Sequence, residues 1–257
     1  MRRQIVEQEL APNALERSRE NVLACRREIE EAARRSGRDP SSVSLMAVTK
    51  YVEARVIRLL YQVGVRDFGE STVQGGSARS QELSDLQGIR WHLVGHLQRN
   101  KAHRALEVFE SIHSLDSLSL AQEIRAQAGK RGLPVPDLYV EVNISKEPQK
   151  AGMEDRKLRD FLLALRGEDG ASKSGPPLFP RIAGLMGMAP HAEGPESSRP
   201  YFRQLRETRD SLSREGLLPE GAGLSMGMSG DFPVAVEEGA TVVRIGSYLF
   251  QGLFAAI

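Results

Sequence analysis

The sequence predicts an α/β fold, a single parallel (β/α)8 TIM barrel with an extra N-terminal helix, and three observations favour it. Eight short apolar segments alternate with helical ones, no run of consecutive hairpins occurs, and the 257 residues match the roughly 250 of a typical barrel. One domain over residues 1–257 is therefore expected. An open doubly wound sheet is the alternative. Closure is favoured because the chain stops soon after the eighth strand, while the helix before the first strand can cover the place of an eighth helix.

The individual elements follow from the periodicity of the apolar residues. A first helix is predicted over residues 13–36, where apolar residues recur three, four and seven apart and Gly37 is placed to end it. The strands are predicted from short apolar runs at 43–50, 65–70, 90–95, 111–115, 137–143, 181–188, 223–228 and 241–246. Helical patterns lie between them, at 53–63, 73–87, 100–108, 118–131, 155–166, 200–215 and 233–238. Residues 167–180, rich in glycine, serine and proline, are expected to form a surface loop.

Composition excludes several classes of function. A formal net charge of +1 provides no field for a polyanion, so no nucleic-acid partner is expected. The longest apolar runs are strand length, far short of the roughly 20 residues of a membrane helix. The segment from Met1 to Gln4 is followed by Glu7 and lacks the apolar core of a signal peptide. We therefore expect a cytoplasmic protein without membrane contact. The single cysteine, Cys25, lies on the apolar stripe of the first helix and is interpreted as a packing residue.

Lys50 stands at the carboxyl end of the first predicted strand, where the active groups of a parallel barrel gather. Partial burial there would lower the pKa of the ammonium group and free the amine to attack an aldehyde. A solvated lysine opening a loop is the alternative interpretation. For a lysine taken alone, the solvated interpretation is the better one. The other residues of the predicted barrel mouth are therefore needed to choose between a solvated and a reactive lysine.

The loops after the seventh and eighth strands have the composition of a phosphate site. In barrels these loops often bind phosphate, because small residues let backbone amides approach the oxygens. Here they contain Ser225-Met226-Gly227-Met228-Ser229-Gly230-Asp231 and Arg244-Ile245-Gly246-Ser247. Either loop alone could be an ordinary glycine turn, since neither has Walker spacing. Two such loops at the expected places favour a phosphate.

Arg244 lies inside an apolar strand, and a charge there is rarely left without a partner. An outward ion pair with a helix carboxylate is one possibility. The other is the nitrogen of a bound ring, for which arginine is a known partner. A phosphate on the two loops, an aldehyde on Lys50 and a ring nitrogen on Arg244 would suit one ligand.

The same residues carry a family resemblance that spans nearly the whole chain. The matching segments are 47–50, 68–70, 91–101, 224–229 and 243–247, and they strongly resemble the YggS/PROSC proteins. The resemblance implies a barrel like the amino-terminal domain of alanine racemase, with pyridoxal 5'-phosphate (PLP) held as a Schiff base on Lys50. It implies phosphate contacts from Ser225 or Ser229 with Gly246 and Ser247, and a position of Arg244 near the pyridine nitrogen. The implied role is vitamin B6 (PLP) homeostasis, without an established catalytic reaction.

Two positions depart from that family. Its members usually continue Phe-Gly-Glu with an asparagine, where this chain has Ser71, so the cofactor contact of the asparagine either passes to Ser71 or is lost. Gln251 stands where the family usually has a glycine, which we expect to alter only the tail.

Histidines and methionines near the predicted strand ends need separate interpretation. His92 and His96 would share one face of an extended strand, yet no third ligand stands at a recognisable spacing, so no metal site is expected. His96, Gln98 and Asn100 are expected to line the barrel mouth, with His96 near the cofactor. Four methionines are interpreted as barrel filling, with Met226 also in contact with the cofactor: Met186, Met188, Met226 and Met228.

Three functions fit these expectations. The first is a monomeric carrier or regulator that binds PLP and passes it to PLP-dependent apoenzymes. The second is a weak amino-acid racemase, which is disfavoured because the chain is too short for the second domain that supplies a catalytic tyrosine, and because an arginine at the ring nitrogen weakens the electron sink. The third is a cofactor-free Schiff-base aldolase using Lys50, which would leave Arg244 without a partner.

Overall fold

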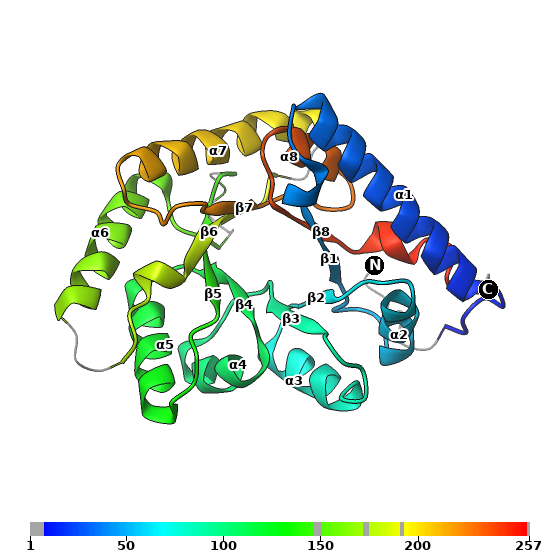
Figure 1. Ribbon diagram of the computed structural model, residues 1–257, viewed down its shortest axis with the longest axis horizontal. Helices are drawn as coiled ribbons and strands as arrows, with labels where there is room; N and C mark the ends of the chain where they lie inside the picture. The colour runs from blue at the N-terminus through cyan, green and yellow to red at the C-terminus, as the bar shows by residue number, and fades with distance from the viewer. Residues whose placement is uncertain (1–7, 146, 148–150, 172–174, 191–192, 256–257) are drawn as a thin grey trace.

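Eight parallel strands close into a barrel in the computed structural model, which describes residues 8–145, 147, 151–171, 175–190 and 193–255 (Figure 1). Each strand pairs with the next, and the last pairs with the first from Ser44↔Val242 to Ala47↔Ile245. The predicted closed barrel is confirmed, and the open sheet is wrong. The strands are β1 (Ser44–Val48), β2 (Asp67–Glu70), β3 (Arg90–Leu93), β4 (Ser111–Leu115), β5 (Asp137–Val142), β6 (Ile182–Gly187), β7 (Gly223–Ser225) and β8 (Val242–Ile245).

Helices surround the strands, as the alternation in the sequence predicts (Figure 1). They are α1 (Ala14–Arg35), α2 (Ala54–Gln62), α3 (Val73–Glu82), α4 (Ala102–Val108), α5 (Leu118–Arg131), α6 (Asp155–Ala171), α7 (Arg199–Arg214) and α8 (Phe232–Glu237). Short 3-10 helices are η1 (Pro40–Ser42), η2 (Arg99–Lys101), η3 (Phe179–Arg181), η4 (Pro195–Ser198) and η5 (Ser247–Phe250). Within the described part of the chain, no helix has the length and apolarity that a bilayer crossing requires. Residues 1–7, which we expect not to form a signal peptide, lie outside the described residues.

Three predicted boundaries differ from the structure by more than two residues. The seventh strand ends at Ser225 and not at Met228, because Gly227 has φ +89° and turns the backbone away; a Cβ there would lie 2.5 Å from the Ala235 side chain. Helix α6 runs on to Ala171, five residues into the predicted loop 167–180, because each of the two glycines there, Gly167 and Gly170, costs a helix only about 1 kcal/mol and need not end it. Helix α3 ends at Glu82, where Leu83 caps it and the chain turns toward β3.

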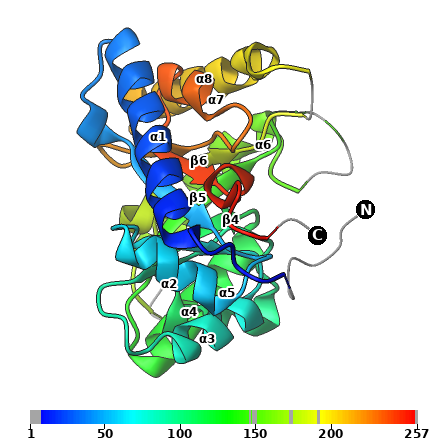
Figure 2. The same ribbon diagram turned by 90° about the vertical axis from the view of Figure 1, so that its right-hand side faces the viewer.

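Helix α1 occupies the place that a helix after β8 would fill, as predicted. It packs against α8, η5 and α2, and Figure 2 shows it running along the outside of the barrel between α8 and α2. Asn21 donates to the carbonyl oxygens of Leu249 and Gln251, and the Tyr248 hydroxyl donates to Glu28, so the chain after β8 is fastened to this helix. Cys25 is fully buried, which raises the pKa of its thiol to about 12 and confirms its interpretation as a packing residue.

The barrel has an apolar outer layer and a polar interior. The residues between strands and helices include Phe68 and Trp91, whose rings lie 5.8 Å apart. Along each strand, side chains that point toward the barrel axis alternate with those that point toward the helices. Several of the inward-pointing side chains are polar and buried, among them His92, Ser111, His113, Glu141, Ser225 and Arg244. Because β4 and β7 are not neighbours, the hydrogen bond between His113 and Ser225 has to cross the interior of the ring.

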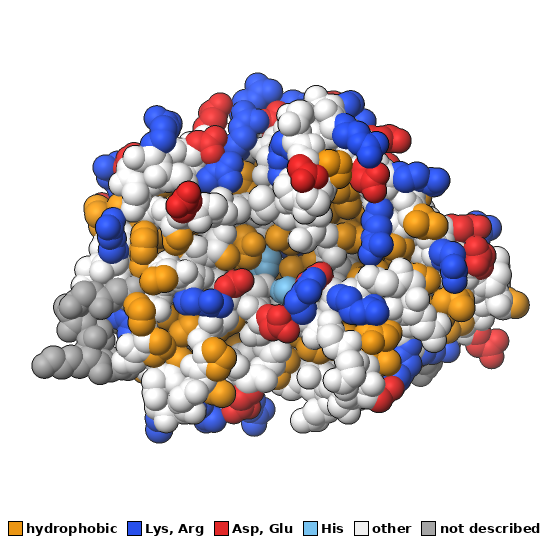
Figure 3. All heavy atoms as spheres, viewed as in Figure 1, with side chains coloured by type: hydrophobic (Ala, Val, Ile, Leu, Met, Phe, Trp, Pro, Cys, Tyr) orange, Lys and Arg blue, Asp and Glu red, His pale blue; other side chains and the backbone are white. Residues whose placement is uncertain are grey.

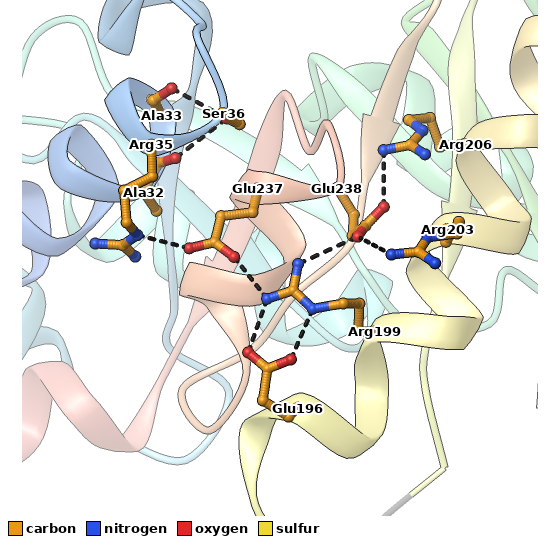
Figure 4. Close-up of polar contacts among 10 residues, drawn as sticks. All are labelled: Ala32, Ala33, Arg35, Ser36, Glu196, Arg199, Arg203, Arg206, Glu237 and Glu238. Carbon is orange, nitrogen blue, oxygen red and sulfur yellow. Dashed lines mark hydrogen bonds and ion pairs between the residues drawn. The ribbon is translucent and has the colours of Figure 1, made fainter.

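An ion-pair network fastens α8 to its surroundings (Figure 4). Glu238, buried at the end of α8, lies within 2.7–3.3 Å of guanidinium nitrogens of Arg199, Arg203 and Arg206. Its neighbour Glu237 pairs with both Arg199 and Arg35, at 2.6 and 2.7 Å, which joins α7, α8 and α1. This network therefore holds the helix that follows the predicted phosphate loop.

Candidate functional site

Lys50 is the second residue after β1, at the carboxyl ends of the strands, and it is exposed. Its ammonium nitrogen stands 5.0 Å from the centre of the Tyr51 ring. Since β1 pairs with β8, with Ala47 opposite Ile245, the lysine and the Gly246-Ser247 loop follow neighbouring strands. The structure thus brings Lys50 and the Gly246-Ser247 loop, two predicted parts of the site, to the same end of the barrel.

Glu70 is a buried carboxyl group near this lysine. Its carboxylate accepts a hydrogen bond of 2.8 Å from the Thr49 hydroxyl. Burial raises the pKa of Glu70, and the Thr49 hydrogen bond and the charges of Arg79 and Lys50 oppose the rise. Ser71, the next residue, is half-buried, and Gly95 passes so close that a Cβ there would lie 2.2 Å from the Ser71 carbonyl oxygen. The segment that follows β3 therefore packs directly against the backbone of Ser71.

The loops after β7 and β8 lie against each other and direct backbone N–H groups to one point. The Ser229 hydroxyl oxygen accepts from the amides of Gly246 and Tyr248, at 3.1 and 3.3 Å. Ser247, between them, is exposed, and Asp231 accepts from the Met228 amide at 2.7 Å. Converging amides of this kind suit an anion, because each supplies a partial positive charge.

Arg244 is buried and points into the barrel, so the outward ion pair considered for it is wrong. Its guanidinium donates to the carbonyl oxygen and the hydroxyl of Ser225, at 2.6 and 2.7 Å, and to the Gly187 carbonyl at 3.3 Å. Burial lowers the pKa of Arg244 to about 10, with Glu141 and Asp231 opposing, so the group remains a cation at neutral pH.

Ser225 and Met226 lie beneath the loops rather than on them. Both are fully buried, and the Ser225 hydroxyl is engaged by Arg244 and His113. Met186 and Met226 are buried as barrel filling predicts, whereas Met188 is half-buried and Met228 is 40% exposed. The prediction for Met228 is wrong because the chain leaves the strand at Gly227 and carries the following side chain to the surface.

The two histidines of β3 and its loop are separated. The strand ends at Leu93, so His92 and His96 do not share a strand face as predicted. His96 stands on the rim, 3.2 Å from Asp116, and lines a cavity of about 490 Å³ together with Gln98 and Asp116. Asn100 does not line that cavity. Among the residues that the structure describes, no cluster of three or more His, Cys, Asp or Glu could hold a metal ion.

Glu141 is a buried carboxyl near Arg244. Burial raises its pKa from 4.5 to about 7, Asp116 adds to the rise, and Arg244 opposes it. Because the folded-state pKa exceeds the unfolded one, the folded protein binds the proton more tightly between these values, and stability falls as the pH rises through this window. We expect Glu141→Gln to remove that fall and to raise the free energy of unfolding at pH 8 by about 3 kcal/mol, with little change below pH 4.5. Urea unfolding at both pH values measures this, and parallel curves for the two proteins would contradict it.

Sequence reasoning missed Glu141, His113 and the contact between Thr49 and Glu70. The signal for His113 was present: Ser111 and His113 are two residues apart in an apolar strand and so share a face. A polar pair on the inner face of a barrel strand needs partners inside the barrel. Which residues those are depends on pairing across the ring, which periodicity does not contain.

The comparisons agree with this geometry. Residues 21–253 match the family model described as alanine racemase, N-terminal domain. Alanine racemase from Bartonella henselae, at 13% identity, has the same fold with a TM-score of 0.63 over 94% of this chain and 63% of the other. The fold and the arrangement of the barrel mouth therefore define a barrel of the alanine racemase N-terminal-domain class.

Closer relatives narrow the assignment. Proteins named pyridoxal phosphate homeostasis protein are 41% identical in Aquifex aeolicus, over 86% of this chain and 92% of that one, and 34% identical in Escherichia coli K12, over 90% and 94%. The solved structure of PipY from Synechococcus elongatus with PLP bound is 38% identical, with a TM-score of 0.72, over 87% of this chain and all of the other. The chain belongs to the pyridoxal phosphate homeostasis protein family, which confirms the resemblance identified from the sequence motifs.

Proposed function

We propose that this protein binds PLP as a Schiff base on Lys50 and acts in intracellular PLP homeostasis as a carrier or regulator. The observation that carries the proposal is the placement of Lys50 and the converging amides of the β7 and β8 loops on neighbouring strands, with the buried Arg244 beneath them. The relatives' names and the PLP in PipY support the choice of ligand. The cytoplasm is the compartment we assign.

The residues present fit PLP group by group. The amides of Gly246 and Tyr248, together with Ser229 and Ser247, would hold the phosphate, which would take the place of the present contacts to Ser229. Ser229 rather than Ser225 is assigned to this role, because the Ser225 hydroxyl is engaged elsewhere. Arg244 would meet the ring nitrogen, and Met226 is assigned to contact with the cofactor. Ser71 and His96 are assigned to the rim of the site.

Bound PLP supplies an aldehyde for the lysine and a ring that can accept electrons. Arg244 limits the second property, because its cationic guanidinium at the ring nitrogen disfavours ring protonation. A weaker electron sink favours retention and release of the cofactor over turnover. Homologues named as homeostasis proteins support the same choice, and PLP-dependent apoenzymes are the proposed recipients.

A titration of the purified protein with PLP, followed by borohydride reduction and peptide mapping, tests the proposal. We expect a visible Schiff-base band and one reduced adduct, on the peptide that contains Lys50. Holo-protein mixed with a PLP-dependent apoenzyme should then lose the band while the recipient gains activity. The absence of any band, or an adduct spread over surface lysines, would refute the cofactor assignment.

A further inference from the structure

A continuous chain of hydrogen bonds runs through the barrel from Arg244 to the opposite end of the strands. Arg244 contacts the Ser225 hydroxyl at 2.7 Å, and that hydroxyl lies 2.8 Å from Nδ1 of His113. The chain continues from His113 Nε2 to Ser111, 2.8 Å, from Ser111 to His92 Nδ1, 2.7 Å, and from His92 Nε2 to Asp67, 2.9 Å. Asp67 is the first residue of β2, so the chain ends at the amino-terminal face of the barrel.

The two ends of the chain fix the position of every proton within it. Arg244 can only donate, and an ionised Asp67 can only accept. Ser225 therefore accepts a hydrogen bond from Arg244 and donates one to His113 Nδ1. The ring proton of His113 is then on Nε2. By the same reasoning Ser111 accepts from His113 and donates to His92, and His92 carries its proton on Nε2 and donates to Asp67. In the reverse direction, Arg244 and His113 would both donate to the Ser225 hydroxyl oxygen. The proton of this buried hydroxyl would then have no acceptor.

The charges and the packing agree with this assignment. Burial opposes ionisation of Asp67, but hydrogen bonds from His92 and Arg90 outweigh it and lower its pKa to about 2. Burial, with smaller effects of the neighbouring His92 and Arg244, holds the pKa of His113 well below its usual value, so the ring stays neutral. The Tyr139 ring stacks on it at 4.2 Å and fixes its plane.

The far end of the hydrogen-bond chain lies near the surface, where the Asp67 side chain is 17% exposed. Arg90, His92, Ser111 and Asp137 line a cavity of about 450 Å³ at the amino-terminal ends of β3, β4 and β5. The face in Figure 3 is hollowed at its centre, where histidine side chains are visible. A change of charge at Asp67 is thus possible without disturbing the residues around Lys50.

We propose that Asp67, His92 and His113 are positioning residues for PLP: Asp67 sets the direction of the hydrogen-bond chain, and the chain holds the Arg244 guanidinium in place for the ring nitrogen. This inference rests on the proposed function, because it assigns Arg244 to the cofactor ring. It adds that the retention of PLP depends on an acidic residue at the other end of the barrel.

Asp67→Asn, compared with Asp137→Asn, tests the inference. Each aspartate begins a strand, lies at the amino-terminal end of the barrel and pairs with an arginine, Arg90 for Asp67 and Arg181 for Asp137. Only Asp67 belongs to the hydrogen-bond chain. An amide can donate as well as accept, so Asp67→Asn no longer fixes the direction. We expect release of PLP from Asp67→Asn to become about three- to tenfold faster, since hydrogen bonds to an ionised acceptor are roughly twice as strong as neutral ones. Asp137→Asn should release PLP at the wild-type rate.

The proton positions provide a readout that needs no cofactor. Two-bond nitrogen–proton correlation spectra of the PLP-free protein should show His92 and His113 protonated at Nε2, and Asp67→Asn should show mixed tautomers. A wild-type His113 protonated at Nδ1, or equal PLP release from the two aspartate variants, would overturn the inference. If instead wild type forms no Schiff base on Lys50, the proposed function fails, and the tautomers still decide whether the chain has the assigned direction.

Discussion

Lys50→Ala is expected to lose the visible Schiff-base band completely and to give no reduced adduct after borohydride treatment. The reason is chemical, because the ε-amine is the only group at this position that can form the covalent link to an aldehyde. Phosphate contacts from the loops after β7 and β8 would remain, so weak noncovalent binding of PLP should persist. Absorption spectra and peptide mapping measure the first effect, and equilibrium dialysis measures the second.

Lys101→Ala is the matched control for this experiment. Lys101 lies in η2, after β3, on the same side of the barrel, and it belongs to none of the assigned cofactor contacts. The band and the adduct on Lys50 should be unchanged in this variant. A Lys50→Ala protein that keeps the band, with the adduct on another lysine, would move the covalent site and contradict the proposal.

Glu238→Ala is expected to produce the largest loss of stability, about 1–3 kcal/mol in the free energy of unfolding, because hydrogen bonds to a buried carboxylate are lost. The carboxylate is buried and interacts with Arg199, Arg203 and Arg206. Its removal leaves Arg203 and Arg206 without this counter-charge, whereas Arg199 keeps Glu196 and Glu237. Urea denaturation measures the change, and the midpoint should fall while the slope stays constant.

Glu196→Ala separates this effect from the loss of a surface ion pair. Glu196 also binds Arg199, through two hydrogen bonds, but its side chain is 69% exposed. Exposed pairs contribute little because water screens them and the side chains lose freedom when they pair. The unfolding curve of Glu196→Ala should therefore overlie that of wild type. Equal losses from Glu196→Ala and Glu238→Ala would show that burial is not what makes the network around Glu238 matter.

The two sites of these predictions are connected by the fold. Helix α8 follows the loop that carries Ser229, and the network around Glu238 fixes α8 against α7 and α1. Arg244 is fixed separately, from inside the barrel, through Ser225. The proposed phosphate loop and Arg244, the proposed partner of the ring nitrogen, are thus held by different parts of the molecule, so a variant in one should leave the other in place.

The sequence by itself determined the fold class, the order of the elements and the positions of Lys50, Gly246 and Ser247 at the barrel mouth. This was possible because these features depend on local information: apolar periodicity defines strands and helices, and in a parallel barrel every strand end reaches the same face. The motifs around Lys50, Trp91 and Ser225 added the family, which the comparisons confirm.

Only the tertiary structure decided what the polar residues inside the barrel do. Arg244, Ser225 and His113 stand on β8, β7 and β4, and their contacts depend on how the ring closes and which strands face each other across it. The end of β7 at Ser225 depends likewise on the close approach of Gly227 to Ala235. Periodicity places a side chain on a face of its strand, but contacts between residues more than a hundred positions apart are set by packing of the closed barrel, and burial there gives Glu141 and Arg244 their shifted pKa values.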